Sequence, residues 1–508
     1  MSSTGKGETM RSRVIGAVCL FVLLLVIPGI ALGYDWKLGD WGNVNLKGDL
    51  TYALKLRTEW PDPSFVDPRS PFYVSGDANF DKGNLGNNAL ISTTEVTVDS
   101  ENITFFGRVQ GFVDFAYIDE DKYNLETRQH AAYNITDSLE FYVEGRTGQF
   151  TTRWGRQILQ WGESTAPIWA PGVNVVSPFF VQRVSSAGYT FRSWQVPTYM
   201  GWGSYRVSEG LSFEGVWAPD FDPRYFMPVV GTFQSPADIL GYGVESDLVE
   251  DLRPKDWADM QQYGGAMRMV VSELNMLELG FYYYHYRSRW PMLKMPEVFP
   301  PKIFVEWPEL DMLGMSFSQA IQTWGLNVQI GGELAWRPNE PLQLEKPMSP
   351  FLASVTKMET SVAGFERSNT LAWDFNAMRF FFDVFDFTPW NFQVSPILEF
   401  YGKAILDYDE TPMSDPQLTA YYMLQLPLTC SDMIDNTRLD LGFSSMGGLH
   451  KQMNMLHSLG FTAGAKYGNS WEVLFGYNFS VGDTVQDQQG KWMWDRDNFV
   501  FKLTYYFI

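Results

Sequence analysis

Apolar and polar residues alternate along several long stretches of this chain. From Val44 to Arg57 the apolar residues occupy the even positions, and most odd positions are polar. Successive side chains of a strand point to opposite faces, so this stretch predicts a long strand with one apolar and one polar face. Comparable alternation predicts further strands at 103–117, 139–145, 211–217, 326–336, 471–481 and 499–507.

The lengths of these strands and of the segments between them favour a membrane barrel. Several strands reach about ten residues, the length needed to cross a bilayer at a tilt. Short turns on one side and long loops on the other are typical of such a barrel. A secreted two-sheet sandwich rich in tryptophan remains an alternative on alternation alone. The predicted long loops are rich in proline, glycine and acidic residues and lie at 61–88, 235–262, 338–369, 407–435 and 482–497.

Both ends of the chain carry features expected of an exported membrane barrel. Arg11 and Arg13 precede an apolar run, and Ala31-Leu32-Gly33 offers the small residues of a secretory cleavage site. We expect residues 1–33 to be a cleaved signal peptide and residues 34–508 to form the barrel. The aromatic strand at Phe499–Ile508 is expected to pair with the first strand and close the barrel. No later apolar stretch reaches the length of a membrane-spanning helix.

Chain length sets the expected size of the barrel. Without residues 1–33, 475 residues remain. At roughly 25 to 35 residues per strand with its share of loop, about 14 to 18 strands are expected, with 16 favoured. The predicted fold class is an all-β transmembrane antiparallel barrel with long extracellular loops. Wall side chains alone do not fill a barrel of that size, so the lumen is open, constricted or plugged by a loop.

Composition excludes some classes of function. Loss of the leader changes the formal charge from −21 to −23, so a basic surface for nucleic acid is not expected. The aromatic content of 16%, with 19 tryptophans, suits two interfacial girdles. Cys430 is the only cysteine after residue 33, which leaves no partner for an intramolecular disulfide. The four histidines show no metal-ligand spacing, and no acid pair stands out as catalytic, so we expect no metal, no cofactor and no enzyme activity.

The stretch from Trp154 to Pro178 carries a family resemblance. It reads Trp-Gly-Arg-Gln, then Trp-Gly-Glu-Ser-Thr, then Pro-Gly-Val-Asn-Val-Val-Ser-Pro. This order resembles a proteobacterial outer-membrane β-barrel family catalogued only as a domain of unknown function, the 1302 family. Residues 332–343 resemble a second signature of the same family. Phe179 and Phe180 depart from the pattern, which usually places an acid shortly after the proline that is Pro178 here.

The resemblance implies a location, a cargo and partners. Members belong to the outer membrane of Gram-negative bacteria. They are discussed alongside a periplasmic lipoprotein and an inner-membrane exporter of hydrophobic substrates. The resemblance therefore implies an outer-membrane conduit for lipid or other hydrophobic cargo.

The same stretch supplies the candidate site. Its density of tryptophan, glycine and charged residues predicts a structured loop that folds inward and narrows the lumen. Arg156 and Glu163 have opposite charges and would focus a field across the pore; the alternative is that they only satisfy each other or nearby backbone at a barrel turn. The candidate channel-lining or constriction residues are Arg156, Gln157, Trp161, Glu163, Ser164 and Asn174.

Three functions remain open on the sequence. A hydrophobic conduit would face aromatic and methionine side chains into the lumen, with Met267, Met269, Tyr282, Tyr284 and Tyr286 as candidates. A hydrophilic or substrate-selective porin would show opposed acidic and basic side chains around a constriction. An adhesin or structural barrel would have a plugged lumen and functional loops. The sequence does not assign the inner and outer faces of the tyrosine run.

Overall fold

The computed structural model describes most of the chain after residue 33. The described residues are 34–39, 41–67, 74–165, 172–184, 186–220, 222–235, 238, 240–296, 302–322, 327–347, 360–385, 388, 390–408, 416–449, 457–481 and 496–507. The predicted signal peptide lies outside them, so its cleavage stays a prediction. Within the described residues no helix has the length and apolarity required to cross a bilayer.

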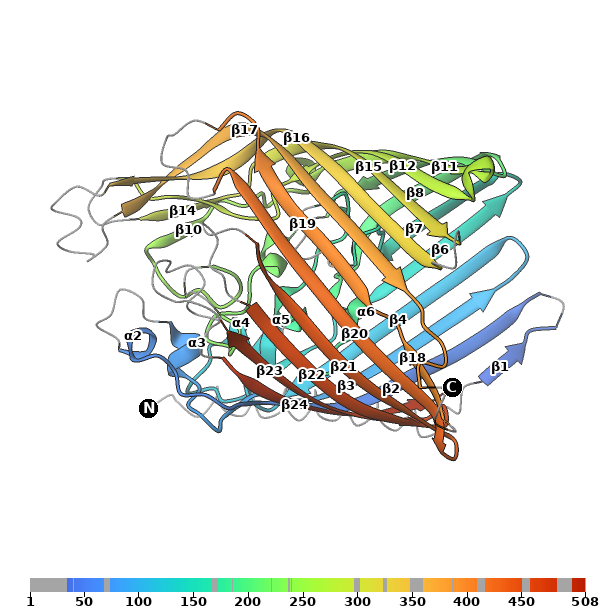
Figure 1. The fold of residues 1–508 in the computed structure, drawn as a ribbon. Coiled ribbons are helices and arrows are strands. Elements are labelled where there is room, and N and C mark those ends of the chain that lie inside the picture. Colours follow the sequence, from blue (N-terminus) through green and yellow to red (C-terminus); the bar gives the residue numbers. More distant parts are fainter. Residues whose placement is uncertain are drawn as a thin grey trace.

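Eighteen antiparallel strands form one closed barrel (Figure 1). They are β2 (Asn43–Arg57), β3 (Leu85–Asp99), β4 (Ile103–Asp114), β6 (Glu140–Thr147), β7 (Phe150–Gln157), β8 (Thr198–Ser208), β9 (Leu211–Ala218), β11 (Gln262–Val271), β12 (Leu277–Arg287), β15 (Glu309–Ile321), β16 (Val328–Pro347), β17 (Thr360–Arg379), β19 (Ile397–Ile405), β20 (Leu418–Ile434), β21 (Thr437–Gly448), β22 (His457–Tyr467), β23 (Trp471–Val481) and β24 (Asn498–Phe507).

Shorter elements lie in the connections. The short strands are β1 (Tyr34–Lys37), β5 (Tyr133–Asn134), β10 (Val249–Asp251), β13 (Met292–Lys294), β14 (Ile303–Glu306) and β18 (Asn391–Val394). The helical turns are α2 (Pro63–Val66), α3 (Ser75–Ala78), α4 (Leu125–Thr127), η1 (Arg128–Ala132), α5 (Val181–Val184), α6 (Phe191–Trp194), η2 (Pro223–Phe226), η3 (Trp257–Met260) and η4 (Ser272–Leu274).

The last strand closes the barrel on the first, as the sequence predicts. β24 pairs with β2 from Gly48 opposite Phe507 to Arg57 opposite Asn498. The hydroxyls of Thr51 and Thr504 meet across this seam at 2.9 Å. Closure leaves no strand edge exposed to lipid.

The strand number lies at the upper end of the expected range, two above the favoured 16. Several hairpins use very little chain. Glu209 and Gly210 alone separate β8 from β9, and Asp435 and Asn436 alone separate β20 from β21. Asn436 adopts a left-handed φ of 58°, which permits so tight a turn. The same length of chain therefore accommodates more strands.

Two predicted loops are largely strand. β16 and β17 each run 20 residues and cover most of 338–369, and β20 begins at Leu418 inside 407–435. A register shift between Arg337 and Glu340 accommodates Pro338 and lets the β16–β17 ladder continue past it. The strand therefore continues through Pro338, and the predicted loop that starts there is wrong.

The outer face of the barrel is apolar. Phe213, Phe281, Leu334, Phe375 and Phe461 are all exposed on it. Intervening residues on the same strands point to the interior, where Glu333 is buried and Glu214 is half-buried. A closed barrel with this apolar-out pattern suits a bilayer.

The long loops pack together at one end of the barrel. Phe80, Tyr117, Phe180, Val229 and Tyr242 come from four separate connections and belong to one buried cluster. The helices α2, α3, α4 and α5 lie in this part of the molecule (Figure 1). The short turns lie at the opposite end, which in outer-membrane barrels faces the periplasm.

Candidate functional site: a segment held against the inner wall

The connection between β7 and β8 enters the lumen. Residues 158–165 and 172–178, called the inward segment below, contact inward-facing side chains of β9, β12, β16, β17 and β19. We call these inner faces the holding wall. Described hydrogen bonds to the holding wall are made by Trp161 and by residues 163–165 in the first part of the segment and by Gly172 and Val173 in the second.

Glu333 on β16 binds both limbs of the inward segment. Its Oε2 accepts a hydrogen bond from the Glu163 N–H at 3.0 Å, and its Oε1 accepts one from the Val173 N–H at 3.1 Å. Glycine makes this approach possible. A Cβ on Gly162 or Gly172 would lie 2.0 or 1.5 Å from a Glu333 carboxylate oxygen, and Gly162 also has a φ of 86°.

Two more wall acids bind the next residues. The Ser164 hydroxyl lies 3.1 Å from Asp374 Oδ2 and 2.8 Å from Glu399 Oε1. Glu399 also accepts a hydrogen bond from the Thr165 N–H at 2.9 Å. Glu333, Asp374 and Glu399 therefore provide acceptors on three neighbouring strands for a segment that has no strand partner of its own.

Aromatic packing fixes the start of the segment. Trp161 is fully buried, and its ring lies 5.5 Å from Tyr282 and 5.7 Å from Tyr284. Its Nε1–H donates to Glu214 Oε2 at 3.2 Å. Arg337 donates to the Gly172 carbonyl oxygen at 2.6 Å. The holding wall thus combines packing with hydrogen bonds to both main-chain and side-chain groups.

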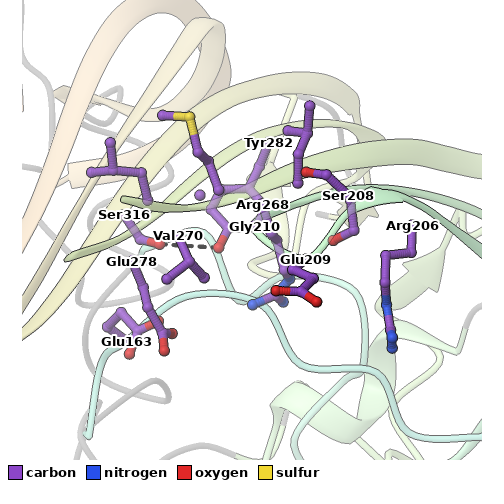
Figure 2. Close-up of a pocket in the computed structure, with 15 residues that line it drawn as sticks. Glu163, Arg206, Ser208, Glu209, Gly210, Arg268, Val270, Glu278, Tyr282 and Ser316 are labelled. Carbon is purple, nitrogen blue, oxygen red and sulfur yellow. Dashed lines mark hydrogen bonds between the residues drawn. The ribbon is translucent and has the colours of Figure 1, made fainter. Parts of the chain in front are cut away.

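A cavity of about 210 Å³ lies beside the segment (Figure 2), and its lining includes the short turn at Glu209 and Gly210. Glu163 and Glu278 lie on one side of it and Arg206 on the other, with Arg268 between them. Arg268 is paired with Glu214 at 2.7 Å. Burial, together with the nearby Glu278, raises the pKa of the Glu163 carboxyl above its ordinary value. The cavity is therefore lined by charges of both signs, with acids in excess once Glu209 is included.

Another part of the inner face is rich in small residues. β21, β22 and β23 turn exposed apolar side chains outward, such as Leu441, Phe461 and Phe475. The alternate positions face the lumen. The glycines and small polar residues in the middle of these strands are called the open wall below, whereas charged residues such as Asp440, Lys466 and Glu472 also face the lumen nearer the strand ends. No hydrogen bond of the inward segment reaches it within the described residues. The open wall comprises Gly442, Ser444, Gly460, Thr462, Gly464, Gly476 and Asn478.

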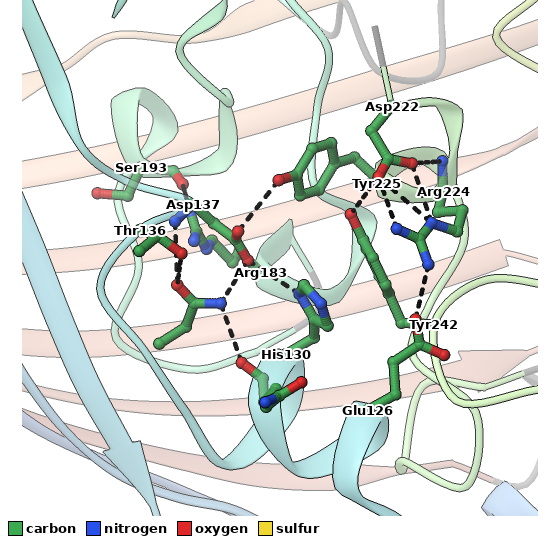
Figure 3. Close-up of polar contacts among 12 residues, drawn as sticks. Glu126, His130, Thr136, Asp137, Arg183, Ser193, Asp222, Arg224, Tyr225 and Tyr242 are labelled. Carbon is green, nitrogen blue, oxygen red and sulfur yellow. Dashed lines mark hydrogen bonds and ion pairs between the residues drawn. The ribbon is translucent and has the colours of Figure 1, made fainter. Parts of the chain in front are cut away.

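The second half of the β7–β8 connection is anchored among the long loops (Figure 3). Asp137 accepts hydrogen bonds from His130 at 3.0 Å and from the Tyr225 hydroxyl at 3.0 Å. Burial alone would raise the pKa of Asp137, but the His130 hydrogen bond and the charge of Arg183 on α5 outweigh it and lower that pKa. Arg183 in turn donates to the Ser193 carbonyl oxygen at 3.3 Å. Asp137 and Tyr225 thus join two long loops, and Gln182 on α5 binds the second of them, since its Oε1 accepts a hydrogen bond from the Val229 N–H at 3.2 Å.

The structure brings some of the predicted site residues together and separates others. Trp161, Glu163 and Ser164 all contact the holding wall. Gln157 is buried at the end of β7 and donates to the Met200 carbonyl oxygen at 3.0 Å. Asn174 is half-buried in the inward segment.

Arg156 lies apart from this group. It pairs in register with outward-facing Phe141 and donates to the carbonyl oxygens of Pro197 and Thr136. Among the described residues no ion pair joins Arg156 to Glu163, whose carboxylate lines the cavity. A shared role for the two charges is thus not supported by proximity.

The residues that bind the segment were not in the predicted site. Glu333 and Arg337 lie in the second family-like stretch, 332–343, but nothing in one sequence connects that stretch to residues 162–173. Asp374 and Glu399 each stand between two apolar residues of their strands, a signal that marks an inward-facing acid without naming its partner. Among the described residues no group of three or more His, Cys, Asp or Glu side chains could hold a metal ion.

Comparison with known proteins identifies a family. The family model described as "Protein of unknown function (DUF1302)" matches residues 13–507. A search of curated proteins finds no match. Among solved structures, OccAB1 of Acinetobacter baumannii aligns with 91% of this chain and 95% of its own, at 9% identity and a TM-score of 0.45. A BenF-like porin from Pseudomonas fluorescens Pf-5 aligns with 91% of this chain and 98% of its own, also at 9% and 0.45.

Proposed function

The chain belongs to the DUF1302 family, and we propose that it is a selective outer-membrane channel whose inward segment narrows the path for polar solutes. One observation carries the proposal. A segment whose described residues have no strand partner is bound to one side of the lumen by three wall acids, next to a charged cavity, while the open wall carries small side chains.

The path in this proposal runs between the inward segment and the open wall. Ser444 and Thr462 face the lumen and are exposed, whereas Trp161 and Tyr284 on the other side are covered. Small inward side chains leave room where large ones would fill the bore. The segment would then set the narrowest cross-section.

Charge supports a polar solute over a hydrophobic one. Tyr282, Tyr284 and Tyr286 do face inward, but they are buried, and the first two pack against Trp161. Met267 pairs with exposed Phe281 on the outer face. The apolar candidates are thus used for packing or for lipid contact, whereas the cavity offers Glu163, Glu278 and Arg206. The excess of acids favours cations.

A lipid or other hydrophobic cargo is the second candidate function. Met446 and Leu474 lie on inward-facing positions beside the open wall, which gives an amphipathic solute some apolar contact. A periplasmic lipoprotein and an inner-membrane exporter as partners belong to this proposal. Both follow from the family resemblance.

Reconstitution tests the proposal and separates the candidates. The purified protein is inserted into planar bilayers for single-channel recording and into liposomes for uptake of lysine, glutamate, a neutral sugar and a fluorescent fatty acid. The proposal expects stable conductance, cation preference and faster uptake of lysine than of glutamate. Uptake of the fatty acid alone would favour the second candidate, and a folded barrel with neither conductance nor uptake would overturn both.

A further inference from the structure

The cavity beside the inward segment is lined by charges of both signs that form no ion pairs with each other. Glu163, Glu278 and Arg206 all line it, and among the described residues none of the three has an ion-pair partner. Arg268 also lines the cavity, but it is already paired with Glu214 at 2.7 Å. Two acids and one base of the lining are therefore available to a charged solute.

Glu214 satisfies Arg268 from within the wall. Its Oε1 accepts a hydrogen bond from Arg268 Nε, and its Oε2 accepts one from the indole N–H of Trp161 and one from that of Trp202, at 3.2 Å each. Arg268 thus has its counter-ion without the help of the cavity. Neutralising Arg268 does not explain the two acids that face the cavity.

These two acids lie together at one end of the cavity (Figure 2). Glu163 comes from the inward segment and Glu278 from β12, and the negative charge of Glu278 acts on the Glu163 carboxylate. Neighbouring carboxylates repel each other, and a cation between them removes that repulsion. This end of the cavity therefore suits an ammonium group.

Arg206 provides a positive charge at the other end (Figure 2). It follows Ser204 by two residues on β8, and Ser204 pairs with the inward-facing Glu214, so Arg206 also points into the lumen. β9 and β11 separate β8 from β12, which places the backbones of these two strands about 14 Å apart. A solute that bridges the two ends needs its opposite charges at the two ends of a chain.

The lining between the two ends is mixed. The hydroxyls of Tyr282 and Ser316 are hydrogen-bonded at 3.0 Å (Figure 2), and a Cβ on Gly280 would collide with the Tyr282 hydroxyl. Arg268 and Glu209 also lie between the ends and have opposite charges. The middle of the cavity therefore favours neither sign and offers an aromatic ring and hydroxyls to the chain of a solute.

We propose that this cavity binds solutes with an ammonium group at one end of a short chain and a carboxylate at the other, such as an ω-amino acid or a short peptide. The ammonium group binds between Glu163 and Glu278, and the carboxylate binds Arg206. This inference rests on the proposed function, because the solute reaches the cavity through the lumen, and it narrows the polar solutes to one class.

Three compounds with the same six-carbon chain test the need for both charges. ε-Aminocaproate has both end groups, hexylamine has only the amine, and caproate has only the carboxylate. Binding of each labelled compound to the folded barrel in detergent is measured by equilibrium dialysis, and binding to empty micelles is subtracted. We expect ε-aminocaproate to bind several-fold more tightly than either of the other two.

Two variants assign the two ends. Arg206→Gln should reduce the affinity for ε-aminocaproate to about that for hexylamine, and Glu278→Gln should weaken it several-fold. Arg438→Gln and Glu472→Gln are the matched controls, because both residues lie outside the cavity lining and have ion partners of their own, Asp440 and Lys502. The controls should leave the affinity unaltered, and heat-dependent gel mobility verifies that each variant is folded.

Equal binding of the three compounds by the folded barrel would overturn the proposal, as would equal losses in the cavity variants and the controls. Planar-bilayer recording separates this result from the proposed function. Conductance without preferential binding of ε-aminocaproate would remove the site and leave the channel. Preferential binding that depends on Arg206 and Glu278, in a barrel that does not conduct, would support the site and overturn the channel.

Discussion

The holding wall and the open wall have similar outer faces and opposite inner faces. Outside, both present apolar rings such as Phe375 and Phe461. Inside, the holding wall carries Glu333, Asp374 and Glu399, whereas the open wall carries mainly glycine, serine and threonine. The bilayer constrains the outer face in the same way all around the barrel. The composition of the inner face instead depends on whether that part of the wall binds the inward segment or leaves room in the lumen.

Removing the acids of the holding wall should have the largest effect on conductance, because these acids distinguish it from the open wall. In the double variant Glu333→Ala and Glu399→Ala, the N–H groups of Glu163, Val173 and Thr165 lose their acceptors. A buried N–H without a partner costs about 1–3 kcal/mol, so the inward segment should detach. Single-channel conductance should rise several-fold.

The matched control is Glu472→Ala. Glu472 faces the lumen from β23 and pairs with Lys502 at 2.5 Å, away from the inward segment. It should leave conductance within about twofold of the unmodified protein, since exposed or half-exposed pairs contribute little. Equal increases in both variants would mean that the segment does not limit the current.

Narrowing the lumen at the open wall should have the next largest effect on conductance, in the opposite direction. Thr462→Trp places a large ring in the lumen, whereas Ala463→Trp places the same ring on the lipid-facing side of the same strand. We expect the first change to reduce conductance by half or more and the second to leave it unaltered. A block by Ala463→Trp alone would reverse the assignment of the two faces.

A methyl group added where Glu333 binds the inward segment should weaken this attachment by a smaller amount. Gly172→Ala sets a Cβ 1.5 Å from Glu333 Oε1, so the carboxylate must shift. Overpacking of this kind costs about 1–3 kcal/mol. Hydrogen exchange of residues 159–165 should accelerate. Gly215→Ala, whose Cβ would meet nothing within 4 Å, is the control and should leave the exchange rate unaltered.

The smallest predicted effect concerns selectivity. Because burial and Glu278 raise the pKa of Glu163, its carboxyl becomes neutral at a higher pH than an ordinary glutamate, and its contribution to cation preference is lost as the pH falls through that raised pKa. Glu163→Gln should lower the cation preference at neutral pH and flatten its dependence on pH. Reversal potentials in a salt gradient provide the measurement. An unchanged pH profile would remove Glu163 from the path.

Local pattern predicted the barrel, but it could not predict the contacts inside it. Alternation from Val44 to Arg57 and at the C-terminus depends on neighbours in sequence, and the closure of β24 on β2 was confirmed. The contact of Glu333 with the Val173 N–H joins residues 160 positions apart. Nothing local distinguishes Glu333 from another lumen-facing acid. Arg156 shows the converse, since it is close to Glu163 in sequence but lies on the outer face of β7, whereas Glu163 lies in the lumen.

Thiol accessibility tests the path between the two walls most directly. In the Cys19→Ser and Cys430→Ser background, single cysteines at Ser444 and Thr462 on the open wall and at Tyr284 on the holding wall are treated with a charged, membrane-impermeant methanethiosulfonate during recording. The account predicts stepwise loss of current at Ser444 and Thr462 and no change at the covered Tyr284. Rapid block at Tyr284 with none at Ser444 and Thr462 would contradict it.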